Sequence, residues 1–161
     1  MARDCYKSFC VGTRRFAVLK RRLIPKLQLK SRTFGAVRRM ISVTTVQFGR
    51  VVEIGDPVSQ AKIYEAQAAD EIIFLDIDAH SEHRSVMLDT VRRAAGEIAM
   101  PITVGGGVGS LADFRTLLVN GADKVSVNTA AVENPDLIHA ASSSFGAQCV
   151  VLSIDYRKDG D

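Results

Sequence analysis

Residues 101–136 restrict the possible folds of this chain most strongly, because glycines and small polar residues directly follow two apolar strands. This stretch reads PITVGGGVGSLADFRTLLVNGADKVSVNTAAVENPD. Ile102–Val104 predicts a short strand that runs into Gly105–Gly107, where the backbone can turn sharply and lie close to a ligand. An amphipathic helix over residues 111–118 and a second strand, Lys124–Val127, follow. In parallel α/β folds the carboxyl ends of strands carry the active site, and we expect one at these two strand ends.

Similar patterns along the rest of the chain predict alternating strands and helices. Strands are expected over residues 23–29, 41–48, 71–77 and 148–155, and helices over residues 57–68, 84–98 and 135–144. The run over residues 71–77 is almost continuously apolar, which is typical of a strand buried on both faces of a parallel sheet. Asp56 and Pro57 supply the N-cap and first residue of a helix, whereas the basic residues 30–40 are interpreted as a loop.

The repeated strand–helix pairs favour a (βα) barrel over an open sheet. A complete barrel needs eight strands and about 250 residues, whereas this 161-residue chain supplies five core strands. We therefore expect either a truncated barrel or a protein that covers its open sheet edges by association. The predicted organisation is a basic, flexible N-terminal extension over residues 1–21 and one domain over residues 22–161.

Composition and charge exclude several classes of protein. No stretch approaches 18 consecutive apolar residues, so no membrane span is expected. Cys5, Cys10 and Cys149 are odd in number and unpatterned, which indicates a reduced, cytoplasmic protein without a disulfide framework.

Residues 1–39 hold 12 of the 21 Lys and Arg residues but only one acid. This basic arm is interpreted as a flexible extension, with an organellar transit peptide or a nucleic-acid-binding arm as alternatives.

Five motifs together resemble one known family. They are GDPV (55–58), DEIIFLDIDA (70–79), PITVGGGV (101–108), GADKVSVNTAAVENP (121–135) and SIDYRKDG (153–160). They are similar to the cyclase subunit of imidazole glycerol phosphate synthase, from histidine biosynthesis, and the resemblance runs over residues 22–161. The sister isomerase shares the glycine turn, but NTAAVENP fits the cyclase better. The resemblance implies an α/β fold that is the N-terminal five-eighths of a (βα)8 TIM-type barrel of the phosphate-binding, ribulose-phosphate-like kind.

The resemblance also implies a reaction. In that family a glutaminase partner makes ammonia, which passes through the barrel to a bisphosphate substrate without a cofactor. Two aspartates act as general acid and base; one matches Asp155, whereas the other position falls on Gln28, which cannot exchange a proton near neutral pH. A family lysine is replaced by Thr44. These departures resemble the cyclase-like paralogues of surface-sugar amidation.

The family's phosphate site is matched by a small set of residues. Gly106, Gly107, Asn128 and Thr129 would hold an anion with backbone N–H groups and a hydroxyl, without a metal. Asp76 and Asp78 would face the acceptor. The alternative for Asp76 is a helix N-cap or loop anchor, and the alternative for Asp155 is a structural role.

The family's ammonia gate lies at the opposite, amino end of the barrel. Arg22, Glu71 and Lys124 match three of its charged residues, and Asp123 matches a residue that faces the glutaminase. The alternative is that these are ordinary solvated ion pairs at strand starts, which contribute little.

Three functions follow from these observations. The first is the ammonia-using cyclase/lyase-type subunit of an amidotransferase complex, as a surface-sugar paralogue or, alternatively, as the histidine-pathway cyclase. The second is a phosphate-binding half-barrel without catalysis. The third, a nucleic-acid binder, has no aromatic platform or motif to support it.

His80 and His83 lack a nearby third ligand, so no metal site is expected. The acceptor and the oligomeric state stay open.

Overall fold

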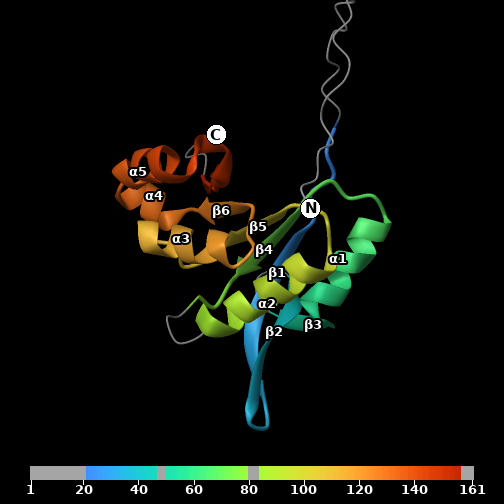
Figure 1. Cartoon of the computed structure of the whole chain (residues 1–161). Helices are drawn as coiled ribbons and strands as arrows, with labels where there is room; N and C mark the ends of the chain where they lie inside the picture. The colour runs from blue at the N-terminus through green and yellow to red at the C-terminus, as the bar shows by residue number, and fades with distance from the viewer. Residues whose placement is uncertain (1–20, 47–49, 80–83, 157–161) are drawn as a thin grey trace, which may run out of the picture.

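The chain forms a seven-stranded sheet with helices packed against it (Figure 1). The computed structural model describes residues 21–46, 50–79 and 84–156. The strands are β1 (Lys26–Phe34), β2 (Val37–Val46), β3 (Arg50–Gly55), β4 (Ile72–Asp76), β5 (Ile102–Gly105), β6 (Lys124–Val127) and β7 (Val150–Leu152). The helices are α1 (Pro57–Ala66), α2 (Arg84–Glu97), α3 (Leu111–Val119), α4 (Thr129–Glu133), α5 (Asp136–Phe145) and the 3₁₀ turn η2 (Ala147–Cys149).

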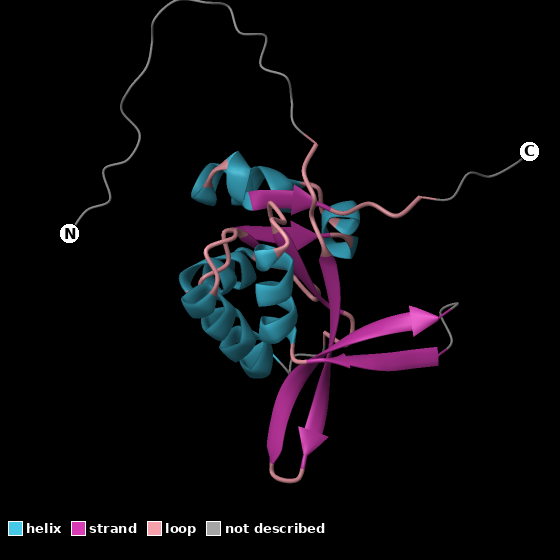
Figure 2. Cartoon of the chain, turned by 90° about the vertical axis from the view of Figure 1, so that its right-hand side faces the viewer, coloured by secondary structure: helices cyan, strands magenta, loops and turns pink. Residues whose placement is uncertain are grey.

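The strand order is β3-β2-β1-β4-β5-β6-β7. Strands β1, β4, β5, β6 and β7 run parallel, whereas β2 and β3 are antiparallel additions beside β1. The longer helices lie on one side of the sheet (Figure 2). This mostly parallel α/β arrangement is that of the first five strands of a (βα)8 TIM-type barrel and confirms the predicted fold class.

The core lies between the sheet and the helices because alternate side chains of each strand point to that side. Phe74 of β4, Val104 of β5 and Val125 of β6 are almost fully buried there, together with Phe114 of α3. The Phe114 ring stacks against Phe145 of α5, with ring centroids 6.2 Å apart. The core thus fixes the parallel strands relative to one another, and with them the loops at their carboxyl ends.

The other side of the parallel strands carries two rows of side chains that correspond to the interior of a barrel. Lys26, Ile73, Thr103 and Lys124 are successive register partners in the first row. The second row, one step closer to the carboxyl ends, consists of Gln28, Leu75, Gly105, Ser126 and Val151. The first row lies nearer the amino ends of the parallel strands and the second nearer their carboxyl ends, so the interior face runs from one end of the strands to the other.

The predicted loop over residues 30–40 is wrong. β1 continues to Phe34, turns at Gly35 and returns as β2, so these residues form a two-stranded ribbon. Gly35 has φ +59°, as the first central residue of a tight hairpin turn requires. The basic side chains hid this strand pairing, since they do not form an apolar pattern.

Other boundaries also differ from the prediction. β1 begins at Lys26, three residues after the predicted start, and β3 and the short helix α4 were not predicted. The last strand is shorter than predicted, and Cys149 lies in η2 rather than in the strand. The predicted strand end at Phe48 and nearly all of the predicted N-terminal extension lie outside the described residues. In the part that the structure describes, no helix is long and apolar enough to cross a membrane.

Candidate active site

A cleft of about 290 Å³ lies at the carboxyl ends of β5, β6 and β7. It brings together residues that are far apart in sequence: Lys26, Leu75, Gly106, Gly107, Val108, Ser126, Val127, Asn128, Thr129, Ala130, Ser153 and Asp155. All four predicted phosphate-binding residues and Asp155 are among them. The loops that sequence analysis selected from separate motifs therefore meet in one concave site.

The glycine turn after β5 has a steric cause. Gly106 has φ +106°, and a Cβ atom there would lie 2.2 Å from the carbonyl oxygen of Asp76. Gly107 has φ +60°, in the left-handed region that side chains disfavour. Only glycine at position 106 allows the turn to pack against the end of β4, and this packing places the Gly107 backbone beside the cleft.

Asn128 orients the carboxylate of Asp155. Its Nδ2 donates a hydrogen bond of 2.8 Å to Asp155 Oδ2, so the side chain does not cap the following helix α4. The carbonyl oxygen of Asn128 accepts the N–H groups of Ala131 and Val132. Thr129 and Ala130, the first residues of α4, line the cleft beside Asn128.

Asp76 ends β4 and packs against the glycine turn, and Asp78 follows it two residues later. Asp76 is 8% exposed, and its Oδ1 accepts the backbone N–H of Asp78 at 3.0 Å. Neither residue is among the described residues that line the cleft. This geometry is that of a loop anchor, the structural alternative for Asp76, whereas contact of either carboxylate with an acceptor remains a prediction.

Gln28 lies in the interior row, beside Leu75 of β4. Its Oε1 atom is buried and has no hydrogen-bond partner among the described residues. Gln28 lines a neighbouring cavity of about 350 Å³ together with Lys26 and Thr44. Gln28, which the resemblance predicts at the position of the family's other aspartate, is therefore next to the cleft rather than in its wall.

Sequence reasoning missed Lys26, which lines the cleft and the neighbouring cavity. In β1 the buried residues Leu27 and Leu29 face the core, so Lys26 shares the opposite face with Gln28. This alternation was readable from the sequence once the strand was known. Lys26 is a cation within the lining of a site predicted to hold a phosphate.

Three predicted gate residues form a charge cluster at the amino end of the strands. The Glu71 carboxylate pairs with Lys124 and lies 3.4 Å from Arg22 Nη1. Glu71 is only 7% exposed. Burial, followed by repulsion from Arg22, lowers the pKa of Lys124 below its usual value. The cluster is therefore partly desolvated and differs from an ordinary surface ion pair.

Asp123 lies next to this cluster, but one of its oxygens has a structural partner. Asp123 Oδ2 accepts the backbone N–H of Ile102 at 2.8 Å, which ties the start of β6 to the start of β5. Asp70 does the same for the N–H of Leu23 at 2.7 Å. A contact between Asp123 and a partner protein remains a prediction.

Among the described residues, no group of three or more His, Cys, Asp and Glu side chains could hold a metal ion. His80 and His83 lie outside the described residues.

Comparison with known proteins gives a consistent result. A family model described as "Histidine biosynthesis protein" matches residues 22–161. "Imidazole glycerol phosphate synthase subunit HisF" of Lactococcus lactis subsp. lactis (strain IL1403) is 51% identical over 144 residues, which are 89% of this chain and 52% of that protein. The protein of the same name from Caulobacter vibrioides (strain NA1000 / CB15N) is 52% identical over 145 residues, 89% of this chain and 53% of the relative.

A third relative is "Putative imidazole glycerol phosphate synthase subunit hisF2" of Prochlorococcus marinus (strain MIT 9313). It is 47% identical over 144 residues, 89% of this chain and 55% of the relative. The chain thus spans about half the length of the curated relatives it matches.

Proposed function

Because this chain belongs to the histidine biosynthesis protein family, we propose that it acts as the cyclase subunit of imidazole glycerol phosphate synthase. In this role it takes ammonia from a glutaminase partner and uses it on a phosphorylated acceptor. The relatives carry the name of that synthase subunit, so they favour the histidine-pathway alternative over surface-sugar amidation, the function expected from Gln28 and Thr44.

The meeting of Asn128, Thr129 and Asp155 in one cleft is the observation that carries this proposal. The N–H groups of Thr129 and Ala130 and the Thr129 hydroxyl can donate to a phosphate from one side. The Gly107 backbone can approach from the other side, because Gly107 lines the cleft and has no side chain of its own. A phosphate held there would place the rest of the acceptor beside Asp155.

Asp155 is the proposed acid/base group. The amide of Asn128 fixes one carboxylate oxygen, which leaves the other free to take a proton from the attacking amine or to return one to a leaving group. Asp155 is exposed to solvent in the unliganded protein, so the bound acceptor itself would exclude water from it.

The interior rows offer a path for ammonia. The charge cluster of Arg22, Glu71 and Lys124 stands at the amino end, where a partner would deliver ammonia. On the interior face, Thr103 is the register partner of Lys124 in the cluster and Ser126 lines the cleft, and their hydroxyls can hydrogen-bond ammonia on its way.

Gln28 favours a second candidate function, phosphate binding without catalysis. An amide can orient an acceptor but cannot replace a carboxylate as proton donor or acceptor. Binding without turnover, even with ammonium supplied, would support this second function.

The first test concerns the phosphate cradle, defined as Gly107, Asn128 and Thr129. Thr129→Ala removes a hydroxyl donor, and loss of a hydrogen bond to a charged group corresponds to roughly tenfold or more in affinity. Calorimetry with ribose 5-phosphate and ribose separates the phosphate contribution from that of the sugar. Thr116→Ala is the matched control, since Thr116 lies on α3 outside the cleft lining and its Oγ1 donates to the carbonyl oxygen of Ala112. Equal loss of affinity for both ligands would refute the cradle.

The second test concerns Asp155. Asp155→Asn should keep affinity for the phosphorylated ligand within about twofold, while turnover of the phosphorylated acceptor with ammonium falls by ~10²–10⁴. Unchanged turnover in this variant would exclude Asp155 as the acid/base group.

A further inference from the structure

The β1–β2 ribbon has an edge that no other described strand covers. β2 pairs with β1 from Val37 to Val43, whereas β3 pairs with β2 only from Ser42 to Val46. Residues 37–41 therefore have a strand on one side only, within the part of the chain that the structure describes. Figure 2 shows the ribbon extending beyond the helices that pack on the sheet. We call residues 37–41 of β2 the free edge.

Main-chain donors and acceptors point outward from the free edge. In an antiparallel pair, residues that exchange both main-chain hydrogen bonds alternate with residues whose main-chain groups point away from the partner strand. Phe34 and Val37 flank the two-residue turn of the ribbon, so they form a pair of the first kind. The N–H and C=O groups of Arg38 and Met40 therefore point outward. An extended chain that lies along the edge can pair with them, as in β-strand addition.

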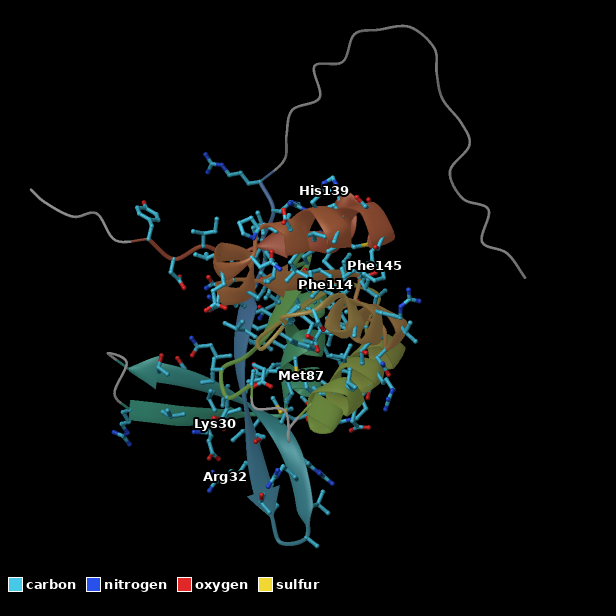
Figure 3. The ribbon with its side chains drawn as sticks, turned by 90° about the vertical axis from the view of Figure 1, so that its left-hand side faces the viewer. Lys30, Arg32, Met87, Phe114, His139 and Phe145 are labelled. Atoms are coloured by element: carbon cyan, nitrogen blue, oxygen red, sulfur yellow. The ribbon has the colours of Figure 1, made fainter. Side chains whose placement is uncertain are left out.

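The two faces of the ribbon have different surroundings. Arg32 lies on the side of the ribbon away from Met87 of α2 (Figure 3). Arg39 is the register partner of Arg32 and shares that side. Because successive side chains of a strand point to opposite faces, Arg38 lies on the side toward α2. A strand added at the free edge would also present one face to each of these surroundings.

The face away from α2 has an apolar groove of about 560 Å³ at the free edge. Phe34, Val37 and Ile41 contribute its apolar lining. Phe34 and Val37 are each 50% exposed, so this lining is open to a partner. The two acids of the groove already have partners: Glu53 pairs with Arg32, and Asp56 Oδ2 accepts the N–H of Ser59 at 2.9 Å. This groove favours apolar side chains on one face of an added strand.

The face toward α2 has a cationic groove of about 570 Å³. Its lining includes Arg38, Arg39 and Arg93, against one described acid, Asp89. Arg93 Nη2 lies 3.4 Å from Asp56 Oδ1, whereas Arg38 and Arg39 make no ion pair within the part of the chain that the structure describes. This groove favours carboxylates on the other face of an added strand, since charge-assisted hydrogen bonds from arginine are strong.

We propose that the free edge binds an extended acidic segment of a partner protein, which joins the sheet as a strand beside β2. The segment alternates apolar and acidic residues over about five positions, because its two faces meet an apolar and a cationic groove. The N-terminal arm of this chain does not fit, since residues 1–20 hold five Lys and Arg residues and one acid. The surface is also separate from the proposed active site, since neither groove shares a described lining residue with the cleft.

Three acetylated and amidated hexapeptides test this recognition. The first alternates valine and glutamate, the second alternates valine and lysine, and the third has three valines followed by three glutamates. Fluorescence anisotropy of the labelled peptides, with the full 161-residue chain, measures the affinities. We expect the alternating acidic peptide to bind at least roughly tenfold more tightly than the other two, because only it combines acidic groups on one face with apolar groups on the other.

Two variants remove cations from the cationic groove. Arg38→Gln and Arg93→Gln should each weaken binding of the alternating acidic peptide roughly three- to tenfold. Arg92→Gln is the matched control, because Arg92 is the neighbour of Arg93 on α2 but lies outside both grooves and donates to Asn120 Oδ1. Its effect should stay below about twofold, since only long-range, screened attraction is lost.

Amide hydrogen exchange locates the contact on the backbone. The amides of Arg38 and Met40 should exchange more slowly when the alternating acidic peptide is bound, because they would then donate to its main chain. The amide of Arg39 points to β1 and should not change. This pattern distinguishes strand addition from binding through side chains alone.

Slower exchange at Arg38 and Met40, with weaker binding in Arg38→Gln and Arg93→Gln but not in Arg92→Gln, supports the inference. No binding of the alternating acidic peptide, equal affinity for the two acidic peptides, or equal effects of the three variants would refute it. Self-association of the chain that the peptide disrupts, seen by light scattering, would also overturn it, because a second copy would then occupy the edge. Thr129→Ala should bind the peptide normally, so this inference and the proposed function are tested separately.

Discussion

Neutralising Glu71 tests whether the charge cluster at the amino end is a desolvated unit. Glu71→Gln leaves the side chain in place but removes the carboxylate that pairs with both Arg22 and Lys124. Removal of one partner of a buried pair costs roughly 3–5 kcal/mol. The Lys124 and Arg22 side chains are 26% and 59% exposed, so water offsets part of this cost. We expect a loss of about 2 kcal/mol in the free energy of unfolding.

The assay is urea unfolding followed by circular dichroism, with Glu97→Gln as the control. Glu97 pairs with Lys62, but both side chains are well exposed, at 39% and 51%, so its loss should cost at most about 0.5 kcal/mol. Burial already lowers the pKa of Lys124, and removal of the paired Glu71 carboxylate should lower it further because an opposite charge favours the charged form. A lysine with a lowered folded-state pKa destabilises the protein while it is charged, so the stability of Glu71→Gln should recover as pH rises through that pKa. Equal losses in the two variants, independent of pH, would refute this account.

Three further predictions concern the turn, a helix cap and the missing carboxylate. Gly106→Ala should destabilise the chain by ~2–4 kcal/mol in urea unfolding, because its Cβ meets Asp76, whereas Gly109→Ala, with nothing within 4 Å, should be nearly neutral. Hydrogen bonds from Ser59 and the charge of Arg93 lower the pKa of Asp56, although burial acts in the opposite direction. The stabilisation that the Asp56 carboxylate gives the fold should therefore be present above about pH 4 and lost on acidification, and Asp56→Asn should lack this loss. Gln28→Asp should raise turnover with ammonium by ~10²–10⁴, and no increase would exclude Gln28 as the missing acid/base position.

Much of the sheet was predictable because its signals are local. The continuous apolar run of β4 and the short apolar run of β6 each lie between helix and turn signals, and both strands were predicted within one residue or two. The cap of α1 was also predicted: Asp56 Oδ2 accepts the N–H of Ser59 as an N-cap should. Such features depend on neighbours within a few residues, which the sequence states directly.

The features that were missed depend on distant partners. Residues 30–40 form a ribbon because β1 supplies hydrogen-bond partners for β2, and no apolar alternation marks this pairing. The bond between Asn128 and Asp155 joins residues 27 positions apart, so the family resemblance named both residues but could not show that one orients the other. Lys26 was overlooked for a similar reason: its place in the cleft follows from the start of β1 and the parallel register with β4.

A phosphate titration followed by amide NMR tests the central claim, that the cleft at the strand ends is an anion site, most directly. With inorganic phosphate added to the ¹⁵N-labelled chain, the largest shifts should occur at the N–H groups of Gly107, Thr129 and Ala130, which border the cleft. The same titration of Thr129→Ala should show weaker saturation at those amides. Shifts confined to other parts of the chain, or saturation unchanged in Thr129→Ala, would contradict the claim.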